Sequence, residues 1–202
     1  MRQEAIETKQ VGKYLVKVFY DEWCDSPRDM CDNIDTIYSN HRHYDPDGHS
    51  IDEILDENDN LSKDFLDSHI WIKVRGYEHS GMTISTSGGY PYNDPWDSGL
   101  FGIIAMSKDH AIKNFGGKKI CTKQVKERAL AYMESNIKVL DSYLQGECYV
   151  FEILDENGEC IDSCGGFIGD IDYALQAALE DAKYYVERDE KKAVEFWAEN
   201  AD

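Results

Sequence analysis

The strongest turn signal in the chain is Asn157-Gly158, which stands between two segments that favour β-structure. Cys148 to Leu154 precedes this turn and Glu159 to Ser163 follows it. The connection Asp155-Glu156-Asn157-Gly158 contains this dipeptide, which is a strong signal for a tight turn between antiparallel strands. The dipeptide therefore predicts a β-hairpin, which limits the fold classes open to the chain.

Further strands are predicted upstream of this hairpin. Ile70 to Tyr77 alternates apolar and polar residues, and Met82 to Thr86 is its expected partner across His79-Ser80-Gly81. Lys13 to Tyr20 and Leu100 to Met106 are also rich in apolar, β-branched or aromatic residues. Hairpin signals outnumber strand–helix–strand patterns. The sequence thus predicts an α+β fold, in which helices pack on a mainly antiparallel sheet.

Two long helices are predicted, one near 122–145 and one near 170–198. The first runs from Thr122 to Gln145, and its apolar residues recur at helical spacing. They are Val125, Ala129, Met133, Ile137, Leu140 and Leu144. Asp170 is the expected N-cap of the second helix, in which the charged stretch Arg188 to Lys192 predicts a break.

Two shorter helices are predicted in the first third of the chain. Ser26-Pro27 is typical of a helix start, and apolar residues then recur at helical spacing as far as Ile37. Ser50 and Glu53 have the spacing of a capping box, which opens a helix through about Glu57.

The chain contains no Ser/Gly-rich linker, so residues 1–202 are predicted to form a single domain. An acidic helical and loop segment, 21–67, precedes a core of sheet and helices, 68–170. The C-terminal helix occupies 171–202. The loop from Ser87 to Gly99 is long and rich in Pro and Gly, as functional loops often are.

Charge is segregated along the chain, whose net charge is −19. Residues 21–67 carry 15 acids and three bases, and residues 141–202 carry 17 acids and four bases. Between them, residues 108–138 carry eight bases and three acids. This balance disfavours direct binding to nucleic acid or to an anionic membrane. It favours a protein partner with a basic surface.

The acids after Ser50 suggest mimicry of a nucleic-acid backbone. On the predicted helix, Asp52, Glu53, Asp56 and Glu57 would place one charge per roughly 2 Å of axis. Duplex DNA carries one per about 1.7 Å. The predicted binding surface comes from segment 21–67 and the C-terminal helix, and the predicted binding residues are Asp52, Glu53, Asp56, Glu57, Asp59, Asp64 and Asp67. The alternative is a solvated acidic face that serves only solubility.

A second hypothesis is catalysis by His79, Asp97 and Cys164, with Ser98 as a further candidate. These residues offer a base, an orienting acid and a nucleophile, as small hydrolases and transferases require. The sequence does not show that they meet. Asp97-Ser98-Gly99 and Asp162-Ser163 are also ordinary turn sequences, in which Asp bonds to its own backbone.

No cofactor or metal site is predicted from the sequence. The six cysteines lack zinc-site spacing, and the two close pairs are too far apart on their predicted elements for a disulfide bond. Those pairs are Cys24 with Cys31 and Cys160 with Cys164. Free thiols suit a reducing cytoplasm. The N-terminus has no apolar core, and no apolar run approaches the roughly 20 residues that span a bilayer, so a soluble cytoplasmic protein is predicted.

Four sequence blocks stand out together in this order. They are Glu78-His79-Ser80-Gly81 with Ile84-Ser85-Thr86, Pro95-Trp96-Asp97-Ser98-Gly99-x-x-Gly102, Asp141-Ser142-Tyr143-Leu144-x-Gly146, and Asp162-Ser163-Cys164 with Gly166-Phe167. Over roughly residues 70–170 the chain resembles a family of small uncharacterised proteins of bacteriophages and mobile elements, although family members often have Trp where Gly165 stands. The resemblance implies no catalytic residue.

What the resemblance does imply is a setting, the cytoplasm of an infected or element-bearing host cell. An inhibitor of a host defence or nucleic-acid-handling protein fits that setting. A generic accessory protein that binds other proteins is a further alternative, and the oligomeric state stays open.

Overall fold

The computed structural model describes residues 4–87, 96–116 and 120–200. Within these ranges it has two four-stranded antiparallel sheets and five α-helices, which confirms the predicted α+β class. The predicted single sheet is corrected to two. Proximity of Cα atoms groups the chain into a terminal unit, residues 1–25 with 146–202, and a central unit, Ser26–Gln145. The single domain stays a prediction.

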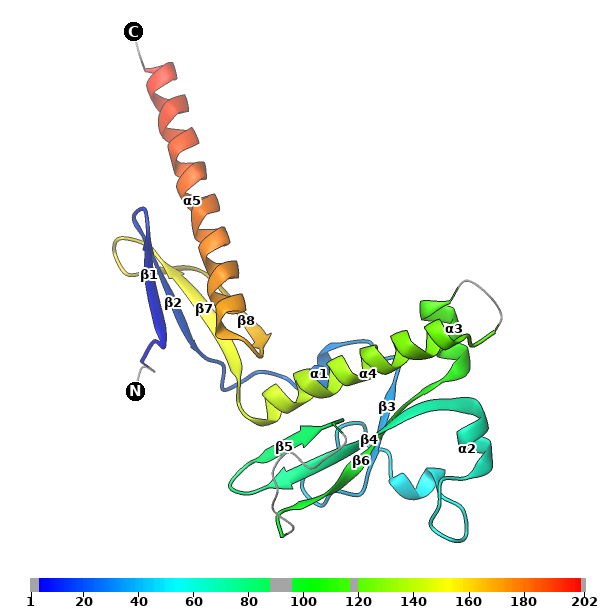
Figure 1. Cartoon of the computed structure of the whole chain (residues 1–202). Helices are drawn as coiled ribbons and strands as arrows, with labels where there is room; N and C mark the ends of the chain where they lie inside the picture. Colours follow the sequence, from blue (N-terminus) through cyan, green and yellow to red (C-terminus); the bar gives the residue numbers. More distant parts are fainter. Residues whose placement is uncertain (1–3, 88–95, 117–119, 201–202) are drawn as a thin grey trace. The chain divides into compact units, whose positions relative to one another are not determined.

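The terminal unit combines the two ends of the chain in one sheet. Its strands lie in the order β1 (Glu7–Val11), β2 (Tyr14–Tyr20), β7 (Cys148–Leu154) and β8 (Cys160–Ile168), all antiparallel. Helix α5 (Ile171–Glu199) packs on one face of this sheet (Figure 1). The predicted hairpin is thus confirmed: β7 and β8 are joined by residues 155–159, where Gly158 adopts a positive φ and Asp155 N donates to Glu159 O at 2.9 Å.

Small side chains let α5 lie close to the sheet. Ala174, Ala178 and Ala182 are fully buried against the inner residues of β2 and β7. These inner residues are Tyr14, Val16, Val18, Tyr149, Phe151 and Ile153. The helix continues without a break through Arg188 to Lys192, contrary to the prediction, because each charged side chain there can reach water from a helical backbone.

The central unit has its own sheet and its own long helix. The strand order is β3 (Thr36–Ser39), β6 (Ser98–Ser107), β4 (His69–Glu78) and β5 (Met82–Ser85), again antiparallel. Helix α4 (Lys123–Leu144) matches the predicted helix to within one residue at each end. The Thr122 hydroxyl accepts a hydrogen bond from Val125 N and so caps its start.

Four short helices complete this unit, all of them at its connections. They are α1 (Pro27–Met30), the 3-10 helix η1 (Ile51–Ile54), α2 (Lys63–Ser68) and α3 (Lys108–Phe115).

Both faces of the central sheet are covered by apolar layers. Ile104 and Met106 of β6 pack in the layer beneath α4, whereas Ile103 and Ala105 face the layer of Ile54 and Phe65. Alternate residues of a strand point to opposite faces, so a strand buried on both faces must be apolar throughout. This explains why β6 reads as an uninterrupted apolar run.

The helix predicted from Ser26-Pro27 ends after one turn. Its expected continuation to Ile37 is wrong, because Thr36–Ser39 forms β3 and pairs with β6. Ile37 is fully buried beneath α4, and its neighbour Tyr38 packs edge-on against Phe65 in the opposite layer. The alternation of the strand therefore prevails over a helical spacing that three apolar residues happened to share.

Among the described residues, no helix combines the length and the apolar character that a membrane crossing requires.

Candidate functional site

The predicted binding residues all lie in one excursion of the central unit, residues 51–68, here called the acidic lobe. It comprises η1, a turn and α2, which leave the sheet after β3 and return to it at β4 (Figure 1). Ile54 and Phe65 anchor the lobe, since both are buried against the sheet. The capping box is confirmed at the start of the lobe: Glu53 accepts a hydrogen bond from Ser50 N at 2.9 Å, and Ser50 Oγ accepts one from Asp52 N at 3.1 Å.

The predicted helix through Glu57 is wrong, because the chain folds back after Ile54. Leu55 forms a bridge to Leu61, and Asp56 N donates to Asn60 O at 2.7 Å. The Asp56 carboxylate accepts hydrogen bonds from the backbone of Asn58 and Asn60, which is the turn chemistry typical of Asp. Asp56 and Glu57 consequently do not continue the axis of η1, and the predicted line of four evenly spaced charges is not formed.

The seven carboxylates of the lobe are nevertheless all exposed. They share 18 residues with a single base, Lys63. Glu53 also bonds His49 Nδ1 at 3.0 Å, and this bond, with that from Ser50 N, lowers the pKa of Glu53. Five carboxylates remain outside the capping box and the Asp56 turn. They are those of Asp52, Glu57, Asp59, Asp64 and Asp67.

Among the described residues of the nearby basic stretch, Lys108 and Lys123 bond to groups other than these carboxylates. Lys108 Nζ donates to the backbone carbonyl of Asp67 at 2.6 Å, and Lys123 pairs with Glu127 of its own helix at 3.7 Å. Lys119 lies outside the described residues. Lys108 lies near the C-terminal end of the lobe, where it is engaged by a carbonyl rather than a carboxylate.

Two other acids of segment 21–67 have a structural role. Asp47 accepts two hydrogen bonds from the guanidinium of Arg28, at 2.7 and 2.6 Å, and Asp35 accepts a third at 2.8 Å. Asn136 of α4 donates to the second oxygen of Asp35 at 2.7 Å. Burial raises the pKa of Asp35, although Arg28 and Asn136 oppose this shift. We call these four residues the Arg28 cluster. Nothing in the sequence pointed to it, since Asp35 and Asn136 are 101 positions apart.

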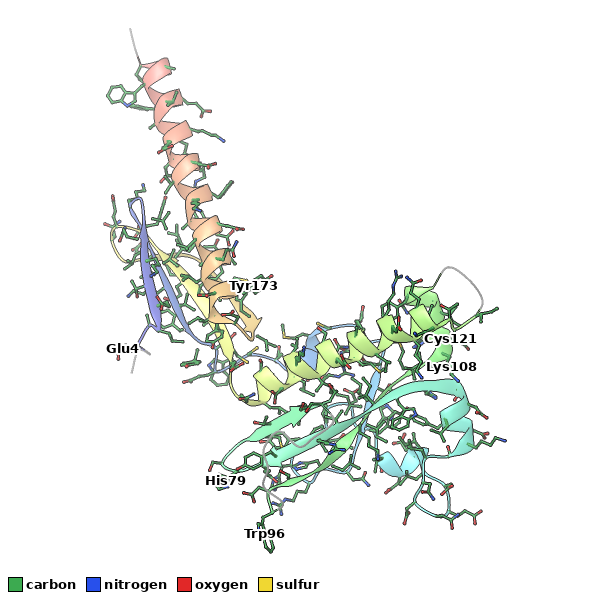
Figure 2. The ribbon with its side chains drawn as sticks, in the orientation of Figure 1. Glu4, His79, Trp96, Lys108, Cys121 and Tyr173 are labelled. Carbon is green, nitrogen blue, oxygen red and sulfur yellow. The ribbon has the colours of Figure 1, made fainter. Side chains whose placement is uncertain are left out.

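The predicted pairing of His79 with Asp97 is present, with 2.7 Å between His79 Nδ1 and Asp97 Oδ2. His79 follows β4 and Asp97 precedes β6, and Glu78 N donates to Asp97 O at 2.9 Å to extend this strand pair. The Tyr77 ring stacks on His79 with centroids 6.1 Å apart. Figure 2 shows His79 and Trp96 at one end of the central sheet and Lys108 and Cys121 at the other.

A cavity of about 190 Å³ lies beside this pair. Its lining includes His41, Glu78, Met82, Asp97, Leu100 and Phe101. Glu78 bonds His43 at 2.8 Å and lies within 3.6 Å of both His41 and Arg42. The bond from His43, helped by these two neighbouring side chains, lowers the pKa of Glu78.

The remaining predicted catalytic residues lie on different strands. Ser98 begins β6 in the central unit, and Cys164 is an exposed residue of β8 in the terminal unit, so the triad stays a prediction. An imidazole oriented by a carboxylate can accept a proton at its other nitrogen. His79 therefore has an orienting partner in Asp97. Residues 88–95 of the predicted functional loop lie outside the described residues.

No group of three or more His, Cys, Asp or Glu side chains in the described ranges is arranged to hold a metal ion. Comparison of the chain with models of protein families, with curated proteins and with solved structures finds no match.

Proposed function

We propose that this protein acts by stoichiometric binding and engages a protein with a basic surface through the acidic lobe. The observation that carries the proposal is the exposure of all seven carboxylates on an element that Ile54 and Phe65 anchor to the sheet. A rigid support matters because binding then costs little ordering entropy.

The resemblance to phage and mobile-element proteins supports a partner of one kind, a host defence or nucleic-acid-handling protein in the host cytoplasm. A dense patch of one sign attracts the basic groove of such a protein and speeds encounter. Mimicry of DNA is proposed here only as a high density of negative charge. The regular, phosphate-like spacing of acids along a helix is not part of the proposal, because the helix ends at Ile54.

The test compares two variants with the same net charge. The lobe variant combines Asp52→Asn, Glu57→Gln, Asp64→Asn and Asp67→Asn, which spares Glu53 and Asp56 because they hold the local fold. The control variant combines Asp181→Asn, Glu187→Gln, Glu190→Gln and Glu195→Gln, all exposed residues of α5. Each protein is immobilised and exposed to host-cell lysate at about 0.05 M and about 0.2 M salt.

The wild type and the control variant are expected to retain the same basic host protein at low salt and to release it at high salt. The lobe variant is expected to bind the purified partner at least about tenfold more weakly, which corresponds to about 1.4 kcal/mol. DNA added as a competitor should displace a partner that handles nucleic acid. Equal losses in the two variants would show that net charge, not the lobe, governs binding.

The His79–Asp97 pair supports a second candidate function, a small hydrolase or transferase. One variant, Asp97→Asn, distinguishes binding through the acidic lobe from catalysis by His79. It alters the partner of the His79 imidazole and leaves the acidic lobe unchanged. A binding protein keeps its partner affinity in this variant. An enzyme loses the activity that its His79 supports.

A further inference from the structure

Within the described residues the two sheets have four outer strands, and three of these edges are shielded from further pairing. Strand β1 has only five residues and carries the charged Lys9. In β3, which has four residues, Ser39 N donates to His49 O at 2.8 Å. In β5, also of four residues, Ile84 N donates to the Asp141 carboxylate at 2.7 Å. Short length, charged side chains and covering groups are the means by which proteins prevent edge-to-edge association.

Strand β8 is the outer strand that lacks such shielding. It has nine residues, none of them buried, and it includes no Lys, Arg or Pro. It lies at the edge of the terminal sheet opposite β1 (Figure 1), and β7 is the only strand of the described chain that pairs with it. An unshielded edge presents backbone N–H and C=O groups to which another strand can add. The outer edge of β8 is therefore available to a further strand.

The regular part of β8 is short. Asp162, Ser163 and Cys164 pair in register with β7, and the register shifts on both sides of this stretch. Asp162 accepts hydrogen bonds from Ser163 N at 2.8 Å and from Tyr185 Oη at 2.9 Å. A carbonyl of an added strand can replace the first of these bonds, while the second keeps the carboxylate in place. We therefore expect an added strand of about three to five residues, centred on Ser163.

The surroundings of β8 are acidic and contain no balancing base. Residues 146–182, which include β7, β8 and the first part of α5, contain ten Asp and Glu residues and no Lys, Arg or His. Near the opposite edge, by contrast, residues 9–17 contain three Lys and no acid. A segment that bears Lys or Arg is attracted to β8, whereas the β8 strand of a second copy would bring like charges together. Charge thus selects a basic segment of a partner protein.

We propose that the outer edge of β8 is a docking site for an extended, Lys- or Arg-bearing segment of a partner protein, which adds to the terminal sheet as a further strand. Backbone hydrogen bonds to β8 supply affinity, and the acidic surroundings select a basic segment. This surface belongs to the terminal unit, whereas the acidic lobe belongs to the central unit. The docking site therefore goes beyond the binding proposed for the lobe and does not depend on it.

The test uses a labelled peptide of about ten residues that alternates lysine and valine. One control peptide alternates glutamate and valine, and the other has prolines at the central positions of the lysine peptide, which removes backbone donors. Fluorescence anisotropy measures affinity for the full chain at about 0.05 M and about 0.2 M salt, and amide hydrogen exchange locates the bound peptide. At low salt the lysine peptide should bind at least about tenfold more tightly than either control, and it should slow exchange in β8 but not in β1.

A matched pair of variants tests the edge itself. Cys164→Lys places in β8 a charge like that of Lys9 in β1, and Thr8→Lys places the same side chain in β1; both original side chains are exposed. Cys164→Lys should weaken binding of the lysine peptide at least about tenfold, whereas Thr8→Lys should bind it as the wild type does. Circular dichroism verifies that both variants fold. Ser163→Lys, also at an exposed position of β8, supplies the comparison if Cys164→Lys does not fold.

The lobe variant separates this docking site from the proposed function. It should bind the lysine peptide as the wild type does. Loss of binding in the lobe variant would place the peptide on the acidic lobe and overturn the site on β8, while the proposed function would stand. Equal affinity for the lysine and glutamate peptides, or slowed exchange only outside β8, would also overturn the site. Sedimentation of the protein alone as a dimer with slow exchange in β8 would show that a second copy, not a basic partner segment, occupies the edge.

Discussion

The Arg28 cluster of the central unit and the residues around Asp189 in the terminal unit combine the same kinds of charge in opposite surroundings. Asp189 accepts hydrogen bonds from Tyr14 Oη and Lys13 Nζ and lies 3.4 Å from Arg188 Nη2. Its side chain is 26% exposed and that of Lys13 is 49% exposed, against 3% for Arg28 and none for Asp35. Arginine and aspartate side chains thus form a buried network in the central unit and a solvent-exposed cluster in the terminal unit.

The difference in burial between the two clusters shows that buried charges need partners within the protein, whereas exposed charges do not. In the Arg28 cluster, both carboxylates and the guanidinium are matched by partners, as burial requires. In the Asp189 cluster, Arg188 Nε is buried without a hydrogen-bond partner among the described residues, and the guanidinium instead lies 4.7 Å from the centre of the Tyr185 ring. Water that reaches the rest of the cluster makes such an imperfect arrangement tolerable.

The largest expected effect comes from breaking the buried cluster. Arg28→Ala leaves Asp35 and Asp47 without their counter-charge, and we expect a loss of about 3–5 kcal/mol in the free energy of unfolding. Urea denaturation followed by circular dichroism measures this loss. The control is Arg42→Ala, which removes an exposed arginine of the same unit and should change stability by less than about 0.5 kcal/mol. Similar losses in the two variants would contradict the comparison.

The next effect is the pH dependence of stability, which has opposite directions for Asp189 and Asp35. Hydrogen bonds from Tyr14 and Lys13 lower the pKa of Asp189 from 3.8 to about 2. Its ionised form therefore stabilises the fold above about pH 4, and this contribution disappears as the pH falls toward 2. Asp35 behaves in the opposite way: its pKa is raised, so its ionisation carries a cost that is relieved at low pH.

Asp189→Asn tests this prediction, because it removes the titrating group and keeps an oxygen that can accept a hydrogen bond. The difference in unfolding midpoint between wild type and variant should be largest above about pH 5 and should shrink steadily as the pH falls through about 2. A difference that stays constant across this range would show that Asp189 does not act through its charge.

The smallest effect is expected for Lys13→Ala. Its ion pair with Asp189 is only 2.9 Å long, but half of the lysine side chain is exposed and solvent screens the attraction. We expect no measurable change in the urea midpoint at about 0.15 M salt, and a small change that appears only at low salt. A large loss here would mean that distance, rather than burial, determines the value of a charge pair in this protein.

Local patterns determined much of the fold. Helical spacing predicted the helix at 122–145, and turn chemistry predicted the hairpin that contains Asn157-Gly158. The capping box at Ser50 followed from residue spacing, and the pairing of β4 with β5 from strand alternation around a turn. Each of these features depends on residues close in sequence. His79 and Asp97 were named as catalytic candidates, but their contact follows from the pairing of β4 with β6, which the sequence did not show.

Segment 21–67 shows where such reasoning failed. Its acid-rich composition predicted a charged surface, and the acidic lobe is one, but Asp35 and Asp47 bind Arg28 in the interior. Ile37 was assigned to a helix because the sequence does not reveal that β6 lies beside it. Leu55 ended η1 because it pairs with Leu61, and this moved Asp56 and Glu57 off the helix that mimicry of DNA would have used.

The sequence by itself determined the α+β class, the two long helices and the concentration of negative charge, because these depend on composition and on short-range periodicity. Only the tertiary structure decided that there are two sheets and which acids are buried. Those outcomes depend on contacts between segments that lie apart in the chain, such as β2 with β7 and Asp35 with Asn136, for which a single sequence carries no local signal.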